Sequence, residues 1–149
     1  MIYQKEGHLF VNIIRYLHRK TDASVLYGYK TVQQALQYMR SHGFAEMPVV
    51  NQEGQYMGTV KEGDFLWYLV DYGGYEQVKD DKVSRVIRKG MVPALKITAT
   101  DEELHKAALR SAGIPIVDSR DAFVGVLDRE DVIRYFAQQE KQATTVGIA

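Results

Sequence analysis

The sequence predicts a mixed α+β fold of two repeated units, each with the order strand, helix, strand, strand, helix. The first observation is a duplication: residues 47–69 read MPVVNQEGQYMGTVKEGDFLWYL, and residues 114–136 read IPIVDSRDAFVGVLDREDVIRYF. The second is that a proline, a glycine and an aspartate recur 67 positions apart: Pro48 and Pro115, Gly58 and Gly125, Asp64 and Asp131 (115 − 48, 125 − 58, 131 − 64). Repeats of this length indicate two copies of one folding unit that pack together and form two equivalent clefts.

Periodicity and turn residues predict the elements of the first unit. Apolar residues spaced i, i+3, i+4 and i+7 from Val32 to Met39 predict a helix that follows Thr31 and ends near Gly43. Two apolar runs, 47–50 and 56–60, flank Asn-Gln-Glu-Gly and predict a β-hairpin. The run DFLWYLVDY that begins at Asp64 predicts a helix with little exposed face, ended by two glycines.

The second unit repeats this order. We expect a short helix at 83–87, a strand at 94–97, a helix at 102–111, a hairpin from 114–117 and 123–127, and a last helix at 129–139. Its early residues align 69 positions from the first copy, pairing Thr31 with Thr100, Arg19 with Arg88 and Lys20 with Lys89. The chain therefore divides into a first repeat with an N-terminal helix at 1–74, a linker at 75–82, a second repeat at 83–139 and a C-terminal tail at 140–149.

Composition excludes several classes of function. Lys plus Arg equals Asp plus Glu at 19 each, so the basic surplus of a dedicated nucleic-acid-binding protein is missing. No cysteine is present, which excludes disulfides, thiolate metal sites and a cysteine nucleophile. No apolar run reaches the roughly 18–20 residues that span a membrane, and the N-terminus lacks a signal-peptide core. These features predict a soluble, cytoplasmic protein with neither a nucleic-acid nor a membrane partner.

The residue pattern gives no support for catalysis. The four histidines, His8, His18, His42 and His105, show no metal-ligand spacing, and no serine lies in a G-x-S-x-G motif. The segment GYKT at 28–31 lacks the upstream glycine of a phosphate-binding loop. We therefore expect no catalytic residue, no metal site and no enzymatic activity.

The repeated aspartates, Asp64 and Asp131, have two interpretations. A carboxylate six residues after the repeated glycine, just inside a helix, can accept hydrogen bonds from both hydroxyls of a ribose, and the helix N-terminus suits a phosphate. The alternative is helix capping, since Asp128 and Asp131 resemble a capping box. The first copy has Lys61 in place of Asp128, and a lysine cannot cap a helix N-terminus.

Two basic pairs and one tyrosine are further candidates. The pairs Arg19-Lys20 and Arg88-Lys89 precede the first strand of each unit, where they either meet ligand phosphates or are solvated charges at a helix end. Tyr29, beside Thr31 at a strand end, is kept as a candidate for stacking on a base, whereas Tyr16, Tyr38, Tyr68 and Tyr135 follow helical patterns typical of core residues.

The duplicated pattern of an apolar-Pro-apolar-apolar-Asx strand, a hairpin, G-x-x-x-x-x-D and an apolar helix resembles a tandem pair of cystathionine-beta-synthase (CBS) domains, over roughly residues 12–136. No enzymatic or membrane domain is attached, so the chain resembles the stand-alone pairs, also known as Bateman modules, that are common in bacteria. This resemblance implies sheet-to-sheet packing about a pseudo-twofold axis and a disc-like homodimer. It also implies that the clefts bind adenosine-containing ligands such as AMP, ADP, ATP, S-adenosylmethionine or cyclic dinucleotides.

The resemblance assigns roles to residues of each copy. Asp64 and Asp131 would hold ribose, Met47-Pro48 and Ile114-Pro115 would wall the adenine, and Thr31 and Thr100 would border the clefts. The chain departs from the family where a hydroxyl residue is expected, since Lys61 and Asp128 stand there. Lys61 can neutralise a phosphate, whereas Asp128 repels one unless Arg129 or a cation compensates.

The clefts should therefore differ, with tighter nucleotide binding beside Lys61 and Asp64. The leading hypothesis is a regulatory module, with no required cofactor, that senses an adenine nucleotide and signals through a dimer to an unidentified protein partner. The alternative is a dimerisation or scaffold subunit of a transporter or enzyme that binds no ligand.

Overall fold

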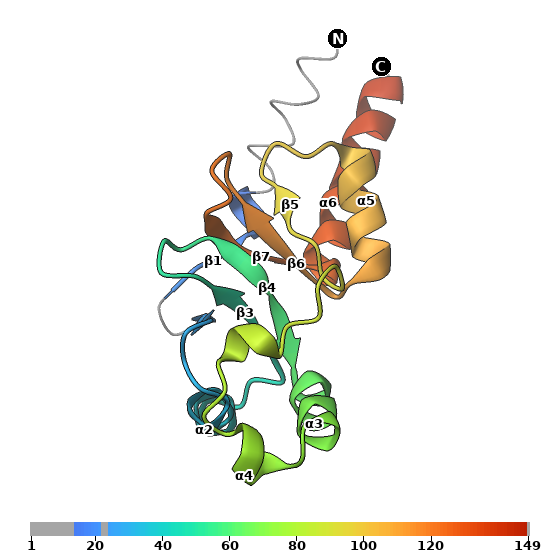
Figure 1. Cartoon of the computed structure of the whole chain (residues 1–149). Coiled ribbons are helices and arrows are strands. Elements are labelled where there is room, and N and C mark those ends of the chain that lie inside the picture. Colours follow the sequence, from blue (N-terminus) through green and yellow to red (C-terminus); the bar gives the residue numbers. More distant parts are fainter. Residues whose placement is uncertain (1–13, 22–23, 149) are drawn as a thin grey trace.

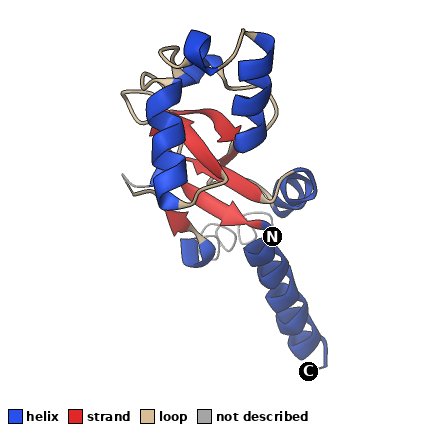
Figure 2. Ribbon diagram, turned by 90° about the horizontal axis from the view of Figure 1, so that it is seen from below, coloured by secondary structure: helices blue, strands red, loops and turns tan. Residues whose placement is uncertain are grey.

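The computed structural model describes residues 14–21 and 24–148, with side chains as far as Lys141. Two small sheets lie next to each other in the middle of the molecule, and the helices cover their outer sides (Figure 1, Figure 2). One sheet belongs to the first half of the chain and the other mainly to the second half. The mixed α and β architecture that the sequence predicts is confirmed. In the part of the chain that is described, no helix is both long and apolar enough to cross a membrane.

The first half has the predicted order of elements. These are β2 (Leu26–Tyr27), α2 (Val32–His42), β3 (Glu46–Val50), β4 (Tyr56–Lys61) and α3 (Glu62–Asp71). β2 is parallel to β3, and β3 and β4 form the predicted antiparallel hairpin. Local chemistry fixes the ends of α2: the Thr31 hydroxyl accepts a hydrogen bond from the Gln34 amide at 3.2 Å, and Gly43 takes the left-handed conformation (φ 70°) that ends the helix.

The second half repeats this order with one addition. Its elements are β5 (Leu95–Lys96), α5 (Asp101–Arg110), β6 (Gly113–Val117), β7 (Phe123–Asp128) and α6 (Arg129–Ile148). β5 is parallel to β6, and β6 and β7 form the second antiparallel hairpin. The addition is β1 (His18–Arg19), which comes from the start of the chain and pairs antiparallel with β7.

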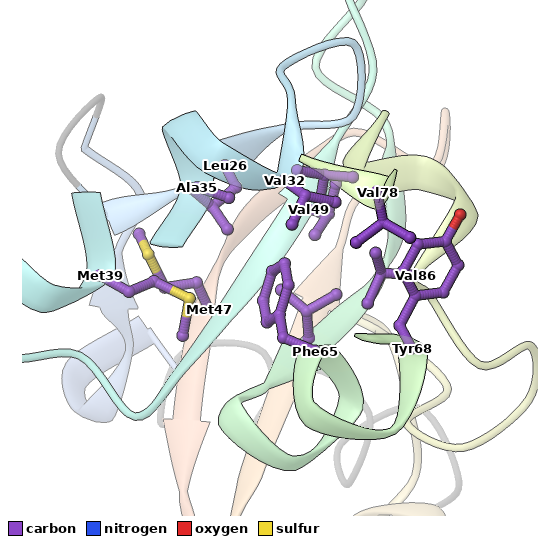
Figure 3. Close-up of a cluster of buried hydrophobic side chains, with 12 residues drawn as sticks. Leu26, Val32, Ala35, Met39, Met47, Val49, Phe65, Tyr68, Val78 and Val86 are labelled. Carbon is purple, nitrogen blue, oxygen red and sulfur yellow. The ribbon is translucent and has the colours of Figure 1, made fainter. Parts of the chain in front are cut away.

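Each half has its own core, and each core includes residues from outside its predicted repeat. In the first core, Val83 and Val86, from η2 (Val83–Arg85) and the residue after it, pack among α2, β3 and α3 (Figure 3). In the second core, Tyr16 and Leu17 from the N-terminal end of the predicted first repeat pack against α5, α6 and the strands. The two halves thus exchange the segments that precede them, which ties one repeat to the other.

The turns of the two hairpins join the halves. The Tyr56 amide donates to the Asp121 carbonyl at 3.2 Å, and the Phe123 amide donates to the Gly54 carbonyl at 3.0 Å. A third cluster, built on Val25, Val50 and Phe123, fills this junction. Burial raises the pKa of Tyr56 to about 12. The Tyr56 phenol therefore stays protonated and donates to the Val92 carbonyl at 2.7 Å.

Three expectations from the sequence differ from the structure. The predicted linker 75–82 contains a further helix, α4 (Tyr75–Val78), because Val78 is buried in the first core. The predicted tail 140–149 begins inside α6, which continues to Ile148. The helix α3 has a wide exposed apolar face instead of little exposed face, since Leu66, Trp67 and Val70 are 55%, 53% and 63% exposed. The bounds of the two repeats themselves remain predictions.

Candidate functional site

The two repeated aspartates occupy equivalent places at the first turns of α3 and α6, immediately after β4 and β7. The last strand of each hairpin leads directly into a helix, so each aspartate lies at a helix N-terminus, where the first amide, that of Glu62 or Arg129, already donates to the carbonyl of Ala45 or Ala112. The surroundings of the two carboxylates differ, and this difference decides what each can bind.

Asp64 links the first repeat to the segment before the second. Its Oδ2 accepts a hydrogen bond from the Lys61 amide at 2.9 Å, which caps α3, while its Oδ1 lies 3.2 Å from Arg88 Nε. Lys61 Nζ lies 3.9 Å from Glu46 Oε2. The side chains of Lys61 and Arg88 are both about half exposed. The capping interpretation thus holds for Asp64. The same carboxylate also forms an ion pair with Arg88, and the amide that it accepts from belongs to a second basic residue, Lys61.

Asp131 lies in more acidic surroundings and is more deeply buried. It is 8% exposed, the one charged or polar side chain that is buried among the residues described. Its Oδ2 lies 3.0 Å from His18 Nε2, and its Oδ1 lies 3.8 Å from Arg134 Nη1. The Asp128 carboxylate approaches the same imidazole at 3.3 Å. The second aspartate therefore shares a histidine with another carboxylate, whereas the first aspartate forms an ion pair with Arg88 and accepts a hydrogen bond from the Lys61 amide.

The remaining charged candidates are divided between these surroundings. Arg129 donates from Nε to the Ala108 carbonyl at 2.7 Å, so its side chain is directed to α5 and fixes the helix pair. Arg19 pairs with Gly125 in the β1–β7 ladder, and the Lys20 amide donates to the Val124 carbonyl at 3.0 Å. Of the two repeated basic pairs, Arg88-Lys89 is the one whose arginine reaches its aspartate. Lys89 is exposed.

The hydroxyl and apolar candidates have structural roles. Thr31 and Thr100 cap α2 and α5, each accepting a hydrogen bond from a backbone amide three residues later at 3.2 Å. Met47 and Ile114 are both 1% exposed, so their side chains belong to the cores. Pro48 is half-buried and Pro115 is buried. The apolar-Pro strands can therefore offer a ligand mainly their backbone.

Two equivalent cavities lie between the first strand and first helix of each half. One, of about 490 Å³, is lined by residues of β2 and α2, Tyr38 among them, and by Lys30 from the turn between these elements. The other, of about 270 Å³, is lined by residues of β5 and α5 and by Ile114 and Pro115. Neither Asp64 nor Asp131 lines either of these two cavities. Tyr29, which is exposed, lines a separate cavity with Met57 and Ser84.

The sequence reasoning missed one residue at the second aspartate. His18 aligns with Ile87 at the shift of 69 (87 − 18), and both residues pack on the repeated glycines: Ile87 against Gly58, and the His18 backbone against Gly125. The shift that aligned Arg19 with Arg88 was the signal that could have placed His18 beside Asp131. The spacing rules for metal ligands apply within one helix or loop and could not have identified this contact, because 113 positions separate His18 from Asp131.

The two halves have the same order of elements, and each carries an aspartate at the equivalent helix start. These features define a tandem-repeat protein. A family model for the CBS domain matches residues 20–71 and again residues 80–138, and the chain therefore belongs to the CBS-domain family as a tandem pair. No protein with a curated description matches it.

Solved structures show the same fold at low sequence identity. A structure of CbpB in complex with c-di-AMP is 15% identical with a TM-score of 0.73, covering 95% of this chain and 98% of that one. A CBS domain protein from Streptococcus pneumoniae is 19% identical with a TM-score of 0.75, covering 93% and 94%. The CbpB protein of Listeria monocytogenes in complex with c-di-AMP is 17% identical with a TM-score of 0.71, covering 88% and 98%.

Proposed function

We propose that the chain is a regulatory module that binds a phosphate-bearing adenosine ligand at the first aspartate. The observation that carries the proposal is the Asp64 carboxylate, which accepts a hydrogen bond from the Lys61 amide and pairs with Arg88, while the Lys61 side chain extends to Glu46 beside it. The carboxylate suits a ribose diol, and the two half-exposed cations suit a phosphate. The similarity in fold to CbpB bound to c-di-AMP supports an adenosine-containing ligand, with c-di-AMP, AMP, ADP and ATP as the candidates.

Such a ligand would act on the contact between repeats. Asp64 belongs to the start of α3, and Arg88 belongs to the segment that follows η2 and leads into the second half. A phosphate that draws Arg88 away from Asp64, or bridges both, changes how strongly the two halves are held together. The ligand shifts the packing of the repeats by its difference in affinity for the two arrangements. This is regulation without catalysis, in keeping with a family whose domains are generally regulatory.

A thermal-shift panel tests the proposal. We expect at least one of c-di-AMP, AMP, ADP and ATP to stabilise the full chain, by about 2.7 kcal/mol when its concentration is a hundred times its dissociation constant. Adenosine should stabilise less, because it lacks the phosphate that Lys61 and Arg88 would meet. The guanine counterparts serve as matched controls for base recognition. If none of the adenine compounds changes the melting temperature, the scaffold alternative is favoured and the proposal is wrong.

We further propose that two copies of the chain form a homodimer through α3 and α6. Leu66 and Ile133 are equivalent residues at the shift of 67 (133 − 66), and they are 55% and 61% exposed. Trp67 and Val70 extend the apolar surface on α3. A surface of this kind that recurs at the same place in both repeats suits an isologous contact, in which the same patch is used by both partners.

The double substitution Leu66→Asp with Ile133→Asp is expected to convert the dimer to a monomer, because it buries two carboxylates per chain in the contact. Light scattering after size-exclusion chromatography measures the mass. Leu109→Asp is the matched control, since Leu109 is 71% exposed but lies on α5. A wild-type chain that is already monomeric, or a dimer that survives the double substitution, would contradict this interface.

A further inference from the structure

His18, Asp128 and Asp131 form a cluster of one imidazole and two carboxylates on the second repeat. One ligand atom from each side chain lies within 4.8 Å of the other two. His18 Nε2 is 3.0 Å from Asp131 Oδ2 and 3.3 Å from Asp128 Oδ2. We propose that this cluster binds one divalent transition-metal cation such as Zn²⁺.

The distances fit a shared cation. Zinc bonds to histidine nitrogen and carboxylate oxygen are about 2.0–2.2 Å long, so neighbouring ligand atoms lie about 3.3 Å apart in a tetrahedral site and about 2.9 Å apart in an octahedral one. The two separations from His18 Nε2 fall at these values. An imidazole ligand favours zinc and its neighbours in the first transition row over Mg²⁺ and Ca²⁺, which prefer oxygen ligands alone.

The fold holds these ligands in place while leaving the cluster open. His18 is fixed in β1 by its pairing with Val126, Asp128 ends β7, and Asp131 lies in the first turn of α6. The side chains of His18 and Asp128 are 63% and 55% exposed, whereas that of Asp131 is 11% exposed. A cation therefore has access from solvent and finds one buried anchoring carboxylate, with room for water to complete its coordination.

The charges around the cluster also favour a cation. Two carboxylates face one imidazole, and Arg134 is the one lysine or arginine with an ion pair to them in the described structure, at 3.8 Å. A bound cation relieves the repulsion between the carboxylates and removes the unfavourable burial of the Asp131 charge. The first repeat lacks this capacity, because Ile87 and Lys61 stand where His18 and Asp128 stand in the second.

Calorimetric titration of Zn²⁺ into the EDTA-treated full chain tests the inference. We expect one equivalent to bind per chain, and Mg²⁺ not to compete. Asp128→Asn changes one exposed ligand atom and should weaken Zn²⁺ binding at least tenfold, since loss of even an indirect partner of a metal ligand costs about 10–100-fold. His18→Gln should do the same.

The controls separate the cluster from the other histidines and from the nucleotide proposal. His105→Ala and Asp64→Asn are expected to leave Zn²⁺ affinity unchanged, and the metal-free melting temperature of Asp128→Asn should match that of the wild type. The competing explanation is a protonated His18 that forms ion pairs with both aspartates. A wild-type chain that binds no Zn²⁺, or variants at His18 and Asp128 that bind it as tightly as the wild type, would overturn the inference. Neither result depends on whether a nucleotide binds at Asp64.

Discussion

Replacing Gly125 with alanine is expected to lower the free energy of unfolding by about 2–3 kcal/mol, because the new methyl group would overlap the backbone of β1. A Cβ at this position meets the carbonyl oxygen of His18 and lies 3.0 Å from Leu17 Cγ. The His18 carbonyl cannot rotate away, since β1 is held to β7 by the pairs His18 with Val126 and Arg19 with Gly125. Overpacking in a fixed contact of this kind costs about 1–3 kcal/mol. Urea denaturation of the full chain measures the change.

Two other glycines provide matched controls. Gly63→Ala lies in α3 with nothing within 4 Å of the new methyl group, and it should stabilise the helix by about 0.5 kcal/mol. Gly58→Ala should cost less than Gly125→Ala, because its methyl group meets the side chain of Ile87 and not backbone. Gly125→Ala should also weaken Zn²⁺ binding, since displaced β1 carries His18 away from Asp131. Equal stability of Gly125→Ala and Gly63→Ala would contradict the packing described for β1.

The local elements could be predicted from the sequence because short-range interactions determine them. The hairpin of 114–117 and 123–127 follows from two apolar runs around a polar turn, and the structure places β6 and β7 there. The helix after Thr31 follows from its spacing, its cap and its terminal glycine. The duplicated proline, glycine and aspartate predict that the two candidate carboxylates lie at equivalent helix starts, and they do so at α3 and α6.

The contacts between repeats could not be predicted in this way. β1 is two residues long, and its pairing with β7 joins positions 108 apart (126 − 18), so no periodicity marks it. The exposed face of α3 was also not predicted. A run of large apolar residues indicates that a helix is buried, but it does not distinguish burial within the same chain from burial against another molecule. Asp128 was recognised as the residue that opposes a phosphate, yet its neighbour His18 belongs to the predicted first repeat at 1–74 and reaches the second through β1.

Asp64→Asn is expected to weaken binding of the adenine nucleotide by about 10–100-fold, whereas Asp131→Asn should leave it nearly unchanged. Asparagine keeps an oxygen that can accept from the Lys61 amide, so the cap on α3 survives. It lacks the charge that strengthens two hydrogen bonds to a ribose diol and that holds Arg88 at 3.2 Å. A hydrogen bond to a charged group contributes about 1.5–3 kcal/mol, which corresponds to this range of affinity. Calorimetry with the compound that gives the largest thermal shift measures it.

The difference between the aspartates follows from the residue three positions before each. Lys61 brings a positive charge to the first, and Asp128 brings a negative charge to the second, where an anionic phosphate would meet two carboxylates. Lys61→Asp should therefore weaken nucleotide binding at least tenfold, and Lys61→Arg should preserve it. Raising the salt concentration should reduce the affinity of the wild type more than that of Lys61→Asp, because the lost attraction is electrostatic. If instead Asp131→Asn abolishes binding and Asp64→Asn does not, the ligand occupies the second repeat, and the charge at 61 and 128 does not select the site.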